Sequence, residues 1–551
     1  METGTPTSTV SVARPPLSAR QMFDMAIGFL GLQFAWQIQM GQMSSLYKTM
    51  GASDTEFSIF WMAGPITGIL VQPIIGSLSD RTWTRMGRRR PFFLIGAILT
   101  ATVLLLMPNV TFFMPSLFSA LVMAAALLWM LDASINTSMG PYRALIPDIA
   151  PPQQHATANA WIGWAIGLGA VASAQIGSLD IHKWLGGDKP ELSSGFSRFI
   201  LKIAPTNTHI LFYVGAITVL LAIGYTVLKV KEYPPEDMEA FRKAKANRVG
   251  FGRWVMDTWG SILHMPKDMA KLCLVQFFTW FPFFCLFIFF TVYVAENIYK
   301  PTSRPMPYAN AVAQLNSMEG SSSRVKWSVA SADKGGLVAV TVQGTDGSVI
   351  SEITPTLKIS SEDAIFLKLR EQGKPFVLVP VQGRPEGKGY SVCNEDVYGE
   401  GNRWAQQCFM IWNVVCLFAA MIIGPLADRF GKKLMHSIGL LAMAAGFGIF
   451  FFSMNATAAM IGMGILGIGW ATTVTMPYAL LAGIIPKGNE GLLMGTFNIF
   501  ICIPQLVCAA TMGWIVDMLG NRPFAFAVAA VSALIAMLVL QAVKEEKPAK
   551  A

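Results

Sequence analysis

The chain has 551 residues, of which 53% are hydrophobic and only 14% are charged, and its mean hydropathy of +0.47 excludes an ordinary soluble globular protein. Its 7 cysteines show no metal-ligand or disulfide-framework spacing, which excludes a zinc module and a disulfide-stapled domain. The net charge of +9 is compatible with nucleic-acid binding, but basic residues in so apolar a chain more often lie in cytoplasmic loops. Most of the chain is therefore predicted to lie in a lipid bilayer.

Residues 1–20 are rich in Thr, Ser and Pro, contain Arg14 and Arg20, and lack the apolar core of a signal peptide, so they predict a cytoplasmic tail. The stretches downstream that are long and apolar enough to span a bilayer as helices lie near 25–47, 57–78, 92–107, 116–140, 157–178, 209–228, 272–295, 405–427, 434–453, 457–484, 492–515 and 522–542. The sequence therefore predicts an all-α integral membrane protein with twelve transmembrane helices.

Lys and Arg are unevenly distributed between the two predicted sides of the membrane. With the N-terminus inside, the cytoplasmic loops contain Arg81, Arg85, Arg88, Arg89, Arg90, Lys231, Arg242, Lys243, Lys245, Arg248, Arg253, Arg429, Lys432 and Lys433. The short outer loops after the third, ninth and eleventh spans contain only Arg522. This bias predicts that both termini are cytoplasmic, and it explains the positive charge without a nucleic-acid partner.

The spans and loops predict seven segments. They are a cytoplasmic tail (1–20), an N-terminal six-helix bundle (21–228), a cytoplasmic linker (229–271), transmembrane helix 7 (272–299), an extracytoplasmic insertion (300–402), the remaining helices 8–12 of a C-terminal bundle (403–543) and a cytoplasmic tail (544–551). The linker is charged and carries the helix breaker Tyr233-Pro234-Pro235. We therefore expect two six-helix bundles joined through the cytoplasm.

The insertion between helices 7 and 8 is polar. Strand-like runs at Leu337–Val342 and Phe376–Val381 are set off by Gly and Pro, and Ser360 with Asp363 opens a short helical pattern. We predict a small, mostly β domain here, with an unstructured insertion as the alternative, because loop insertions cost little free energy. Two states are open for Cys393 and Cys408: they form a disulfide, or both remain unpaired thiols.

An internal repeat relates the two halves. Gly76-x-x-x-Asp80-Arg81 with Gly87-Arg88-Arg89-Arg90 follows the second span, and Gly424-x-x-x-Asp428-Arg429-x-Gly431-Lys432-Lys433 follows the eighth. The two aspartates lie about 350 positions apart, or about 250 without the insertion, which is close to six spans with their loops. Because Gly permits close helix approach and Asp can pair with basic side chains, we predict a conformational latch at Gly76, Asp80, Arg81, Gly87, Arg88, Arg89, Gly424, Asp428, Arg429 and Gly431. For a single copy of this motif, the alternative is a charged turn that only marks the cytoplasmic side of the membrane.

The repeated loop resembles the signature loop of the major facilitator superfamily, and further motifs resemble the plant and bacterial sucrose and maltose transporters, which are glycoside-proton symporters. These motifs cover nearly all of the membrane part and are Gly31-Leu32-Gln33-Phe34-Ala35-Trp36-Gln37-Ile38-Gln39, Gly64-Pro65-Ile66-Thr67-Gly68, Val71-Gln72-Pro73, Ser79-Asp80-Arg81, Leu131-Asp132, Gly140-Pro141-Tyr142-Arg143, Trp280-Phe281-Pro282-Phe283-Phe284 and Ile503-Pro504-Gln505. The chain departs from the plant members at Leu286, Phe287 and Ile288, where they carry an acidic pair, and in the insertion. The resemblance implies two pseudo-symmetric six-helix bundles with the ligand bound between them.

Asp132 is the most informative residue, because it follows an apolar run deep in a predicted span. An ionised carboxylate there costs several kcal/mol unless it is paired or solvated. We therefore predict that Asp132 binds and releases the coupling proton, and an inter-helix hydrogen bond without a transport role is the alternative. The family resemblance implies the same role for this position.

Arg143 lies eleven residues after Asp132, about 16 Å along a straight helix, so the two side chains can share a face without touching. Its planar guanidinium suits a polar substrate or a gating carboxylate, and an anchor at the cytoplasmic end near Asp148 is the alternative. The resemblance implies a role in sugar transport for Arg143.

Sugar recognition needs hydrogen-bonding groups for hydroxyls and apolar rings for the C–H faces. The spans offer both at Gln33, Gln37, Gln39, Asn136, Arg143, Trp280, Asn413, Tyr478, Asn498 and Gln505, which we predict to bind substrate. An inter-helix bond is the alternative fate of each amide, and packing is the alternative for Trp280.

Together these features predict a proton-coupled symporter that imports a glucoside or disaccharide of the sucrose or maltose class. No phosphate-binding loop is present, so ATP-driven transport is not expected. We expect the proton to be the coupling ion, with no metal and no cofactor. We expect a monomer in the cell membrane, and a bacterial inner membrane in particular, with a small sugar and the lipid bilayer as its partners. A sodium-coupled or facilitative sugar carrier, a non-sugar carrier and a sugar-sensing transport receptor are the alternatives.

Overall fold

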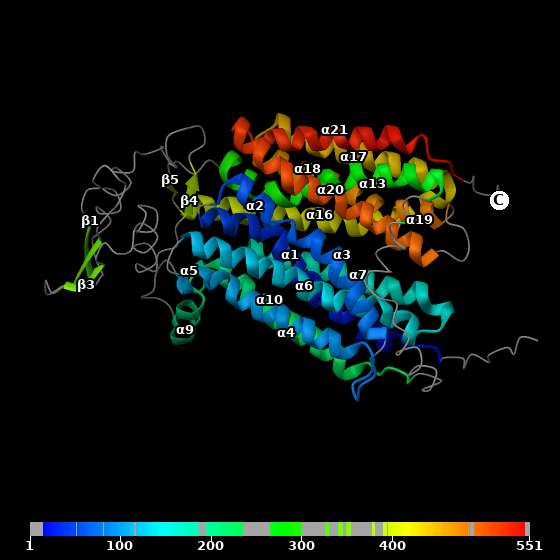
Figure 1. Cartoon of the computed structure of the whole chain (residues 1–551), viewed down its shortest axis with the longest axis horizontal. Helices are drawn as coiled ribbons and strands as arrows, with labels where there is room; N and C mark the ends of the chain where they lie inside the picture. The colour runs from blue at the N-terminus through cyan, green and yellow to red at the C-terminus, as the bar shows by residue number, and fades with distance from the viewer. Residues whose placement is uncertain are drawn as a thin grey trace, which may run out of the picture.

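The computed structural model describes residues 15–50, 52–80, 82–114, 117–186, 194–234, 260, 265–299, 395–482, 484 and 490–545, and five short strands between 325 and 393. Long helices of the N-terminal half (15–234) lie beside long helices of the C-terminal half (265–299 and 395–545), and the strands lie beyond one end of the helices (Figure 1). We call this the insertion end, because α13 and α16 meet the insertion there, and we call the other the opposite end.

The N-terminal half contains six long helical stretches, two of them interrupted, and short connecting helices. Their bounds are α1 Ala19–Thr49, α2 Asp54–Phe60, α3 Ala63–Asp80, α4 Arg90–Leu106, η1 Met107–Asn109, α5 Val110–Phe113, α6 Leu117–Ile149, η2 Pro152–Gln154, α7 His155–Ser178, α8 Ile181–Trp184, α9 Gly195–Ile203 and α10 Asn207–Lys229. Inside this half, α1 packs against α7 and α10, while α6 packs against α3 and α4.

The C-terminal half repeats this plan. Its elements are α13 Lys267–Val292, the π-helical turn η4 Tyr293–Ile298, α16 Glu395–Phe430, α17 Lys432–Phe452, α18 Ala456–Thr473, α19 Met476–Ala482, α20 Glu490–Leu519 and α21 Pro523–Leu540. Here α18 packs against α16 and α17, while α21 packs against α13 and α17.

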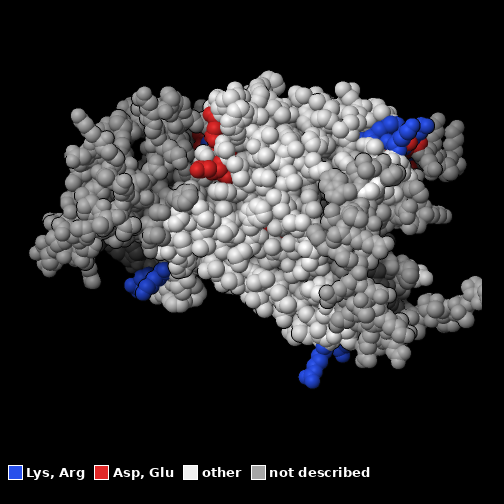
Figure 2. Space-filling view, in the orientation of Figure 1, with Lys and Arg blue, Asp and Glu red and all other residues white. Residues whose placement is uncertain are grey.

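Eleven helices of the described residues are long and apolar enough to cross a membrane. Helix α1 is not among them, although its 31 residues give it a length of about 46 Å. Four glutamines between Gln33 and Gln42 lower its hydropathy. On the face that Figure 2 shows, the large patches of charged atoms among the described residues lie toward the two ends, and the surface between them is mostly uncharged. The prediction of a mostly helical integral membrane protein is therefore confirmed.

Local signals in the sequence set several helix ends. The side chains of Ser18 and Gln21 form a capping box at the start of α1, and Ser53 and Glu56 do the same for α2. Helix α3 is separated from α2 by a turn at Trp61 and Met62, so the predicted second span is two helices. The predicted tenth span is likewise divided into α18 and α19.

Five strands are described in the insertion. β1 (Val325–Val329), β2 (Val340–Gly344) and β3 (Val349–Ile353) form one antiparallel sheet in the order β1-β2-β3, and β4 (Val377–Pro380) pairs with β5 (Tyr390–Cys393). The other residues of 300–394, including Ser360 and Asp363, lie outside the described residues, so the small β domain stays a prediction. Cys408 is a buried free thiol, and the side chain of Cys393 lies outside the description.

Most of the predicted linker 229–271 and both predicted tails also lie outside the described residues. The predicted boundaries of the seven segments therefore stay predictions. Helix α16 begins at Glu395, ten residues before the predicted span, and α6 continues to Ile149, nine residues beyond its predicted span. These extensions reach past the apolar stretches because polar helix ends can project from a bilayer.

Candidate functional site

Asp132 lies at the middle of α6 and is buried, with 5% of its surface exposed. Its Oδ1 accepts a 2.9 Å hydrogen bond from Nε2 of Gln39 on α1. Its Oδ2 and the Oε1 of Gln39 have no hydrogen-bond partner among the described residues. A Cβ on Gly64 of α3 would lie 3.7 Å from Oδ1 of Asp132, so three helices enclose the carboxyl group. The pairing of two residues predicted for the site, Asp132 and Gln39, is thus present in the structure.

Asn136 lies one turn after Asp132, and its side-chain amide is hydrogen-bonded to two side chains of α3. Its Oδ1 accepts a 2.6 Å hydrogen bond from Nε2 of Gln72, and its Nδ2 donates to Oγ1 of Thr67 at 3.2 Å. Both partners belong to motifs quoted above for the family resemblance. Asn136 therefore joins α3 to α6 in this state.

Gln37 connects the two halves of the molecule. Its Oε1 accepts a 3.3 Å hydrogen bond from Nδ2 of Asn413 on α16. Its buried Nε2 lacks a hydrogen-bond partner within the described part of the chain. Gln33, one turn earlier on the same face of α1, is half-buried. Of the predicted amides of α1, Gln37 therefore faces the C-terminal half, whereas Gln39 faces Asp132 of the N-terminal half.

Aromatic rings gather on the C-terminal side of this contact. The ring of Trp470 on α18 lies 5.4 Å from Trp280 and 5.2 Å from Trp412, measured between centroids. Phe287 packs on Trp412 at 6.1 Å and on Trp36 of α1 at 5.9 Å. The rings thus form a continuous wall that reaches from α13, α16 and α18 to α1.

The wall contains unused hydrogen-bond donors. The indole Nε1 atoms of Trp280 and Trp412 are buried and have no acceptor among the described residues. Gln276, one turn before Trp280, is fully buried, and neither of its amide atoms has a partner in the described part. Buried polar groups are normally paired, so unpaired donors beside apolar rings mark a place for a polar ligand.

A second polar group lies nearer the opposite end. The hydroxyl of Tyr478 on α19 donates a 2.8 Å hydrogen bond to Oδ1 of Asn498 on α20. Arg143 of α6 is close enough to Tyr478 for an electrostatic interaction, although the two belong to different halves. Arg143 and Asn498 are both exposed. Arg143 of the N-terminal half and the pair Tyr478 and Asn498 of the C-terminal half therefore lie near one another.

The structure therefore divides the predicted site residues into groups. Gln39 contacts Asp132, and Gln37 contacts Asn413. Tyr478 contacts Asn498 near Arg143. Gln505 of α20 is half-buried and takes part in none of these three contacts. Trp412, Trp470, Gln276 and Gln72 were not predicted. Trp412 stands next to Asn413 in the sequence, which is the one local signal that pointed to it.

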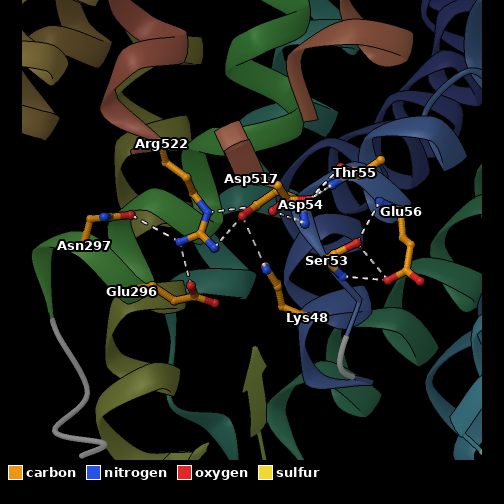
Figure 3. A network of polar contacts seen from close by, with 9 residues as sticks. All are labelled: Lys48, Ser53, Asp54, Thr55, Glu56, Glu296, Asn297, Asp517 and Arg522. Atoms are coloured by element: carbon orange, nitrogen blue, oxygen red, sulfur yellow. Dashed lines mark hydrogen bonds and ion pairs between the residues drawn. The ribbon is translucent and has the colours of Figure 1, made fainter. Parts of the chain in front are cut away.

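At the insertion end the halves are joined by a buried ionic network (Figure 3). Nε and Nη2 of Arg522, just before α21, each donate a 2.8 Å hydrogen bond to the carboxylate of Asp54 on α2. Nη1 of Arg522 lies 2.6 Å from Oε2 of Glu296 in η4. Burial alone would lower the pKa of Arg522, but the carboxylates of Asp54 and Glu296 outweigh it and raise this pKa, so the guanidinium stays charged.

Two more charged residues complete the network. Nζ of Lys48, at the end of α1, lies 3.6 Å from Oδ2 of Asp54. The carboxylate of Asp517 on α20 accepts the backbone N–H of Asp54 at 3.2 Å and that of Thr55 at 2.8 Å, at the N-terminus of α2 (Figure 3). A carboxylate at a helix N-terminus is favourable, so α20 caps a helix of the other half.

Further contacts between the halves also lie toward this end. The carbonyl of Gly41 on α1 accepts hydrogen bonds from Gln406 at 2.8 Å and from Thr291 at 3.0 Å. Nη1 of Arg403 on α16 lies 3.2 Å from Oδ2 of Asp180, which precedes α8. The insertion end is therefore closed by contacts from several helices.

At the opposite end, the hydrogen bonds and ion pairs described below for the two basic loops each lie within one half. Arg88 and Arg89 pair with Asp148 of α6 at 2.9 Å and 2.8 Å. The carboxylate of Glu232 accepts the backbone N–H groups of Arg88, Arg89 and Arg90 at 2.7 to 3.0 Å. Asp148 is thus the partner of the first basic cluster and not of Arg143.

The second copy of the repeat has the same cap. Glu545 accepts the backbone N–H groups of Lys432 and Lys433 at 2.6 and 3.3 Å. Gly87 and Gly431 have φ of +108° and +100° at the two equivalent turns, a conformation that favours glycine. The glutamates were not predicted, because they lie at the far ends of their halves.

The other predicted latch residues are placed as follows. Gly76 and Gly424 lie inside α3 and α16, and an added Cβ on either would meet open space. Asp428 and Arg429 are exposed, and the guanidinium of Arg429 lies 5.2 Å from the centroid of the Phe430 ring. The side chains of Asp80 and Arg81 lie outside the described residues, so the latch stays a prediction.

Curated relatives of this chain include transport proteins. The general alpha-glucoside permease of Schizosaccharomyces pombe is 31% identical over 285 residues, which are 49% of this chain and 47% of that protein. A sucrose transport protein of Arabidopsis thaliana is 24% identical over 563 residues, with 92% of this chain and 85% of that protein covered. The alignment with the permease thus spans about half of each protein, and the alignment with the plant protein spans most of both.

Solved structures show the same fold. A nucleoside transporter superposes with a TM-score of 0.58 at 11% identity over 96% of this chain and 99% of that chain. A D-xylose-proton symporter superposes with a TM-score of 0.54 at 14% identity over 95% of this chain and 97% of that chain. The family model described as Major Facilitator Superfamily matches residues 25–318 and 404–551. Since this match covers well over half of the sequence, the chain belongs to the major facilitator superfamily of membrane transport proteins and is not an enzyme.

Proposed function

We propose that this protein is a proton-coupled symporter that imports a glucoside or disaccharide of the sucrose or maltose class. The observation that carries the proposal is the buried carboxyl group of Asp132, which is bonded to Gln39 on the helix whose Gln37 is bonded to Asn413 of the other half. The names of the curated relatives, an alpha-glucoside permease and sucrose transport proteins, support a sugar substrate. The proton is the coupling ion, no cofactor takes part, and the monomer is the working unit.

Proton binding at Asp132 follows from its surroundings. Its one hydrogen-bond donor among the described residues is the neutral amide of Gln39. An ionised carboxylate so enclosed in a membrane span costs several kcal/mol, and protonation removes that cost. Outward opening lets water and protons reach the group, and inward opening lets the proton leave. Each proton moved across about 100 mV supplies about 2.3 kcal/mol, enough for roughly fiftyfold accumulation of sugar at a one-to-one ratio.

Sugar binding is assigned to the space between Gln37, Asn413 and the aromatic wall. The unpaired Nε2 of Gln37 and the indole N–H groups of Trp280 and Trp412 are donors for sugar hydroxyls. The rings supply apolar surface for the C–H face of a pyranose. Because Gln37 and Gln39 lie on one helix, sugar bound at Gln37 influences the position of Gln39 and so the protonation of Asp132.

Transport by alternating access assigns a state to this structure. We place the insertion outside the cell membrane, with both termini and the latch loops in the cytoplasm, in a bacterial inner membrane. The contacts at Arg522, Gly41 and Arg403 then close the outer side, and exposed Arg143 faces a space open to the cytoplasm. Rocking of the two halves about the site would open the outer side and close the inner one.

The decisive experiment is uptake of a panel of sugars by proteoliposomes under an imposed pH gradient, with wild type, Asp132→Asn and Asp268→Asn compared. We expect wild type to accumulate a glucoside, Asp132→Asn to equilibrate it without accumulation, and Asp268→Asn to remain coupled. Accumulation by Asp132→Asn in step with the gradient would overturn the role of Asp132. Uptake that follows sodium or ignores a protonophore would overturn proton coupling, and transport of none of the sugars would overturn the substrate class.

A further inference from the structure

Helix α9 (Gly195–Ile203) lies at the edge of the N-terminal half at the insertion end, beside α5 and the start of α10 (Figure 1). Its N-terminus is capped by Ser194, whose Oγ accepts the backbone N–H of Ser197. None of its nine residues is buried, and Phe196 and Phe199 are 70% and 59% exposed. Two large aromatic side chains in water are unfavourable, so this helix needs an apolar partner other than the residues that the structure describes.

The helix has three distinct edges. At 100° per residue, Phe196, Phe199 and Ile203 lie within a 60° sector, and all three are exposed. Arg198 and Lys202 lie in the next sector and are exposed too. The remaining side is formed by Ser197, Ile200 and Leu201, which are half-buried against the protein. An apolar edge beside a basic edge is the pattern of a helix that lies at a membrane surface.

The position of α9 agrees with this pattern. Its C-terminal carbonyl, on Ile203, accepts a hydrogen bond of 3.5 Å from the hydroxyl of Tyr213 on α10. Helix α10 is one of the membrane-spanning helices, and α9 lies just before its start at Asn207. Phe113 of α5 and Trp184 of α8, at 60% and 69% exposure, belong to the same end of the molecule. Aromatic side chains collect at this level of a bilayer.

We infer that α9 lies in the surface of the lipid leaflet at the insertion end, with Phe196, Phe199 and Ile203 among the acyl chains and Arg198 and Lys202 at the lipid phosphates. The neighbouring spans also expose apolar side chains, such as Leu221 of α10 and Ile98 of α4, to the lipid. The basic edge is complementary to anionic headgroups. The occupant of this face is therefore the bilayer itself.

Lipid contact at α9 has a structural consequence. The segment 179–206 that carries α9 also carries Asp180, whose carboxylate pairs with Arg403 of the C-terminal half. A helix held in the leaflet fixes one end of that segment relative to the membrane. The anchored segment then holds Asp180, and its ion pair with Arg403, at a fixed position relative to the bilayer. This effect does not depend on which solute the protein transports.

The test places a nitroxide spin label on two adjacent positions with different edges. Phe199→Cys and Arg198→Cys are labelled separately in liposomes of phosphatidylcholine and phosphatidylglycerol, and the signal of the unsubstituted protein is subtracted. Collision with oxygen, which partitions into acyl chains, is compared with collision with a water-soluble nickel chelate. We expect the label at 199 to meet oxygen at least several times more readily than nickel, and the label at 198 to show the reverse.

Two outcomes would overturn the inference. Equal access of nickel to both labels would place the whole helix in water, and shielding of the label at 199 from both reagents would show a protein partner or a second copy. Phe196→Cys provides a second probe of the apolar edge, and Leu201→Cys, on the side toward the protein, is the matched control. None of these measurements depends on transport, so they are independent of the proposed sugar and proton.

Discussion

The guanidinium of Arg522 and the carboxylate of Asp54 form a bidentate ion pair between residues 468 positions apart in the sequence, one in each half of the molecule. Both side chains are buried, so water screens their interaction weakly. Breaking a buried pair by removing one partner typically costs about 3 to 5 kcal/mol, because the other charge stays unpaired. The pair therefore favours the state in which the insertion end is closed.

The first prediction follows from this cost. Arg522→Gln leaves the carboxylates of Asp54 and Glu296 without their common cation, so the closed state loses stability relative to the open one. The cost of about 3 to 5 kcal/mol corresponds to a change of more than tenfold in the population ratio. We expect Ser45→Cys, buried against Tyr398 and Asn402 in the wild-type background, to react with a membrane-impermeant maleimide at least about tenfold faster when combined with Arg522→Gln.

The matched control is Arg20→Gln, which removes an exposed arginine at the opposite end of the molecule. It should leave the labelling rate of Ser45→Cys unchanged. If Arg522→Gln also left the rate unchanged, while circular dichroism showed a folded protein, the ionic network would not hold the insertion end closed.

A second prediction concerns the donor of Gln37. Gln37→Leu removes the unpaired Nε2 and the bond to Asn413 while keeping a side chain of similar length. Loss of one donor to a ligand hydroxyl costs about 1 to 3 kcal/mol, so we expect KM for sugar uptake to rise about tenfold or more. Gln541→Leu, an amide exposed at the opposite end, should leave KM unchanged. An unchanged KM in Gln37→Leu would remove this residue from the sugar site.

Trp412 gives a third prediction, because its ring and its N–H are separable. Trp412→Phe keeps an aromatic ring against Phe287 and Trp470 but removes the unpaired Nε1 donor. We expect sugar affinity, measured by isothermal titration in detergent, to fall about fivefold, with thermal stability lowered by less than about 2 kcal/mol. Trp412→Ala should lower both sugar affinity and stability, because it also creates a cavity. The expected loss of stability is about 3 to 5 kcal/mol. Equal affinity in Trp412→Phe and wild type would mean that the indole N–H makes no contact with sugar.

Much of the fold could be predicted because hydropathy acts over whole spans. A run of about twenty apolar residues can be stable only as a helix in lipid, whatever it packs against. The turn at Trp61 and Met62 was missed, because both residues are apolar and the break depends on packing between α2 and α20. Helix α16 was predicted too short at its start, since the polar turns after Glu395 carry no hydropathy signal.

The candidate site could be proposed from the sequence where one residue conflicted with its surroundings. Asp132 is an acid in an apolar run, and its contact with Gln39 agrees with the expectation that it needs a polar neighbour. Trp412 and Trp470 gave no such conflict, because aromatic residues are ordinary in a membrane span. The pairing of Asp54 with Arg522 was invisible for another reason: both residues lie near span ends, where charges are expected, and only the tertiary fold brings them together.

A fourth prediction concerns the two glutamates that cap the basic loops at the opposite end. Glu232 accepts three backbone N–H groups at the start of α4, and Glu545 accepts two at the start of α17. Replacing either carboxylate by an amide keeps an acceptor but removes the negative charge that the helix N-terminus favours, at a cost of about 0.5 to 2 kcal/mol.

Thermal unfolding in detergent should therefore show a lower Tm for Glu232→Gln and for Glu545→Gln, with the larger fall for Glu232→Gln because it serves more donors. Lys271→Gln removes one partner of a partly exposed ion pair with Asp268 and should change the stability by less than about 0.5 kcal/mol. Because each cap lies within one half, the two losses should add in the double variant. If the double variant lost no more stability than one of the single variants, the two loops would unfold as one unit.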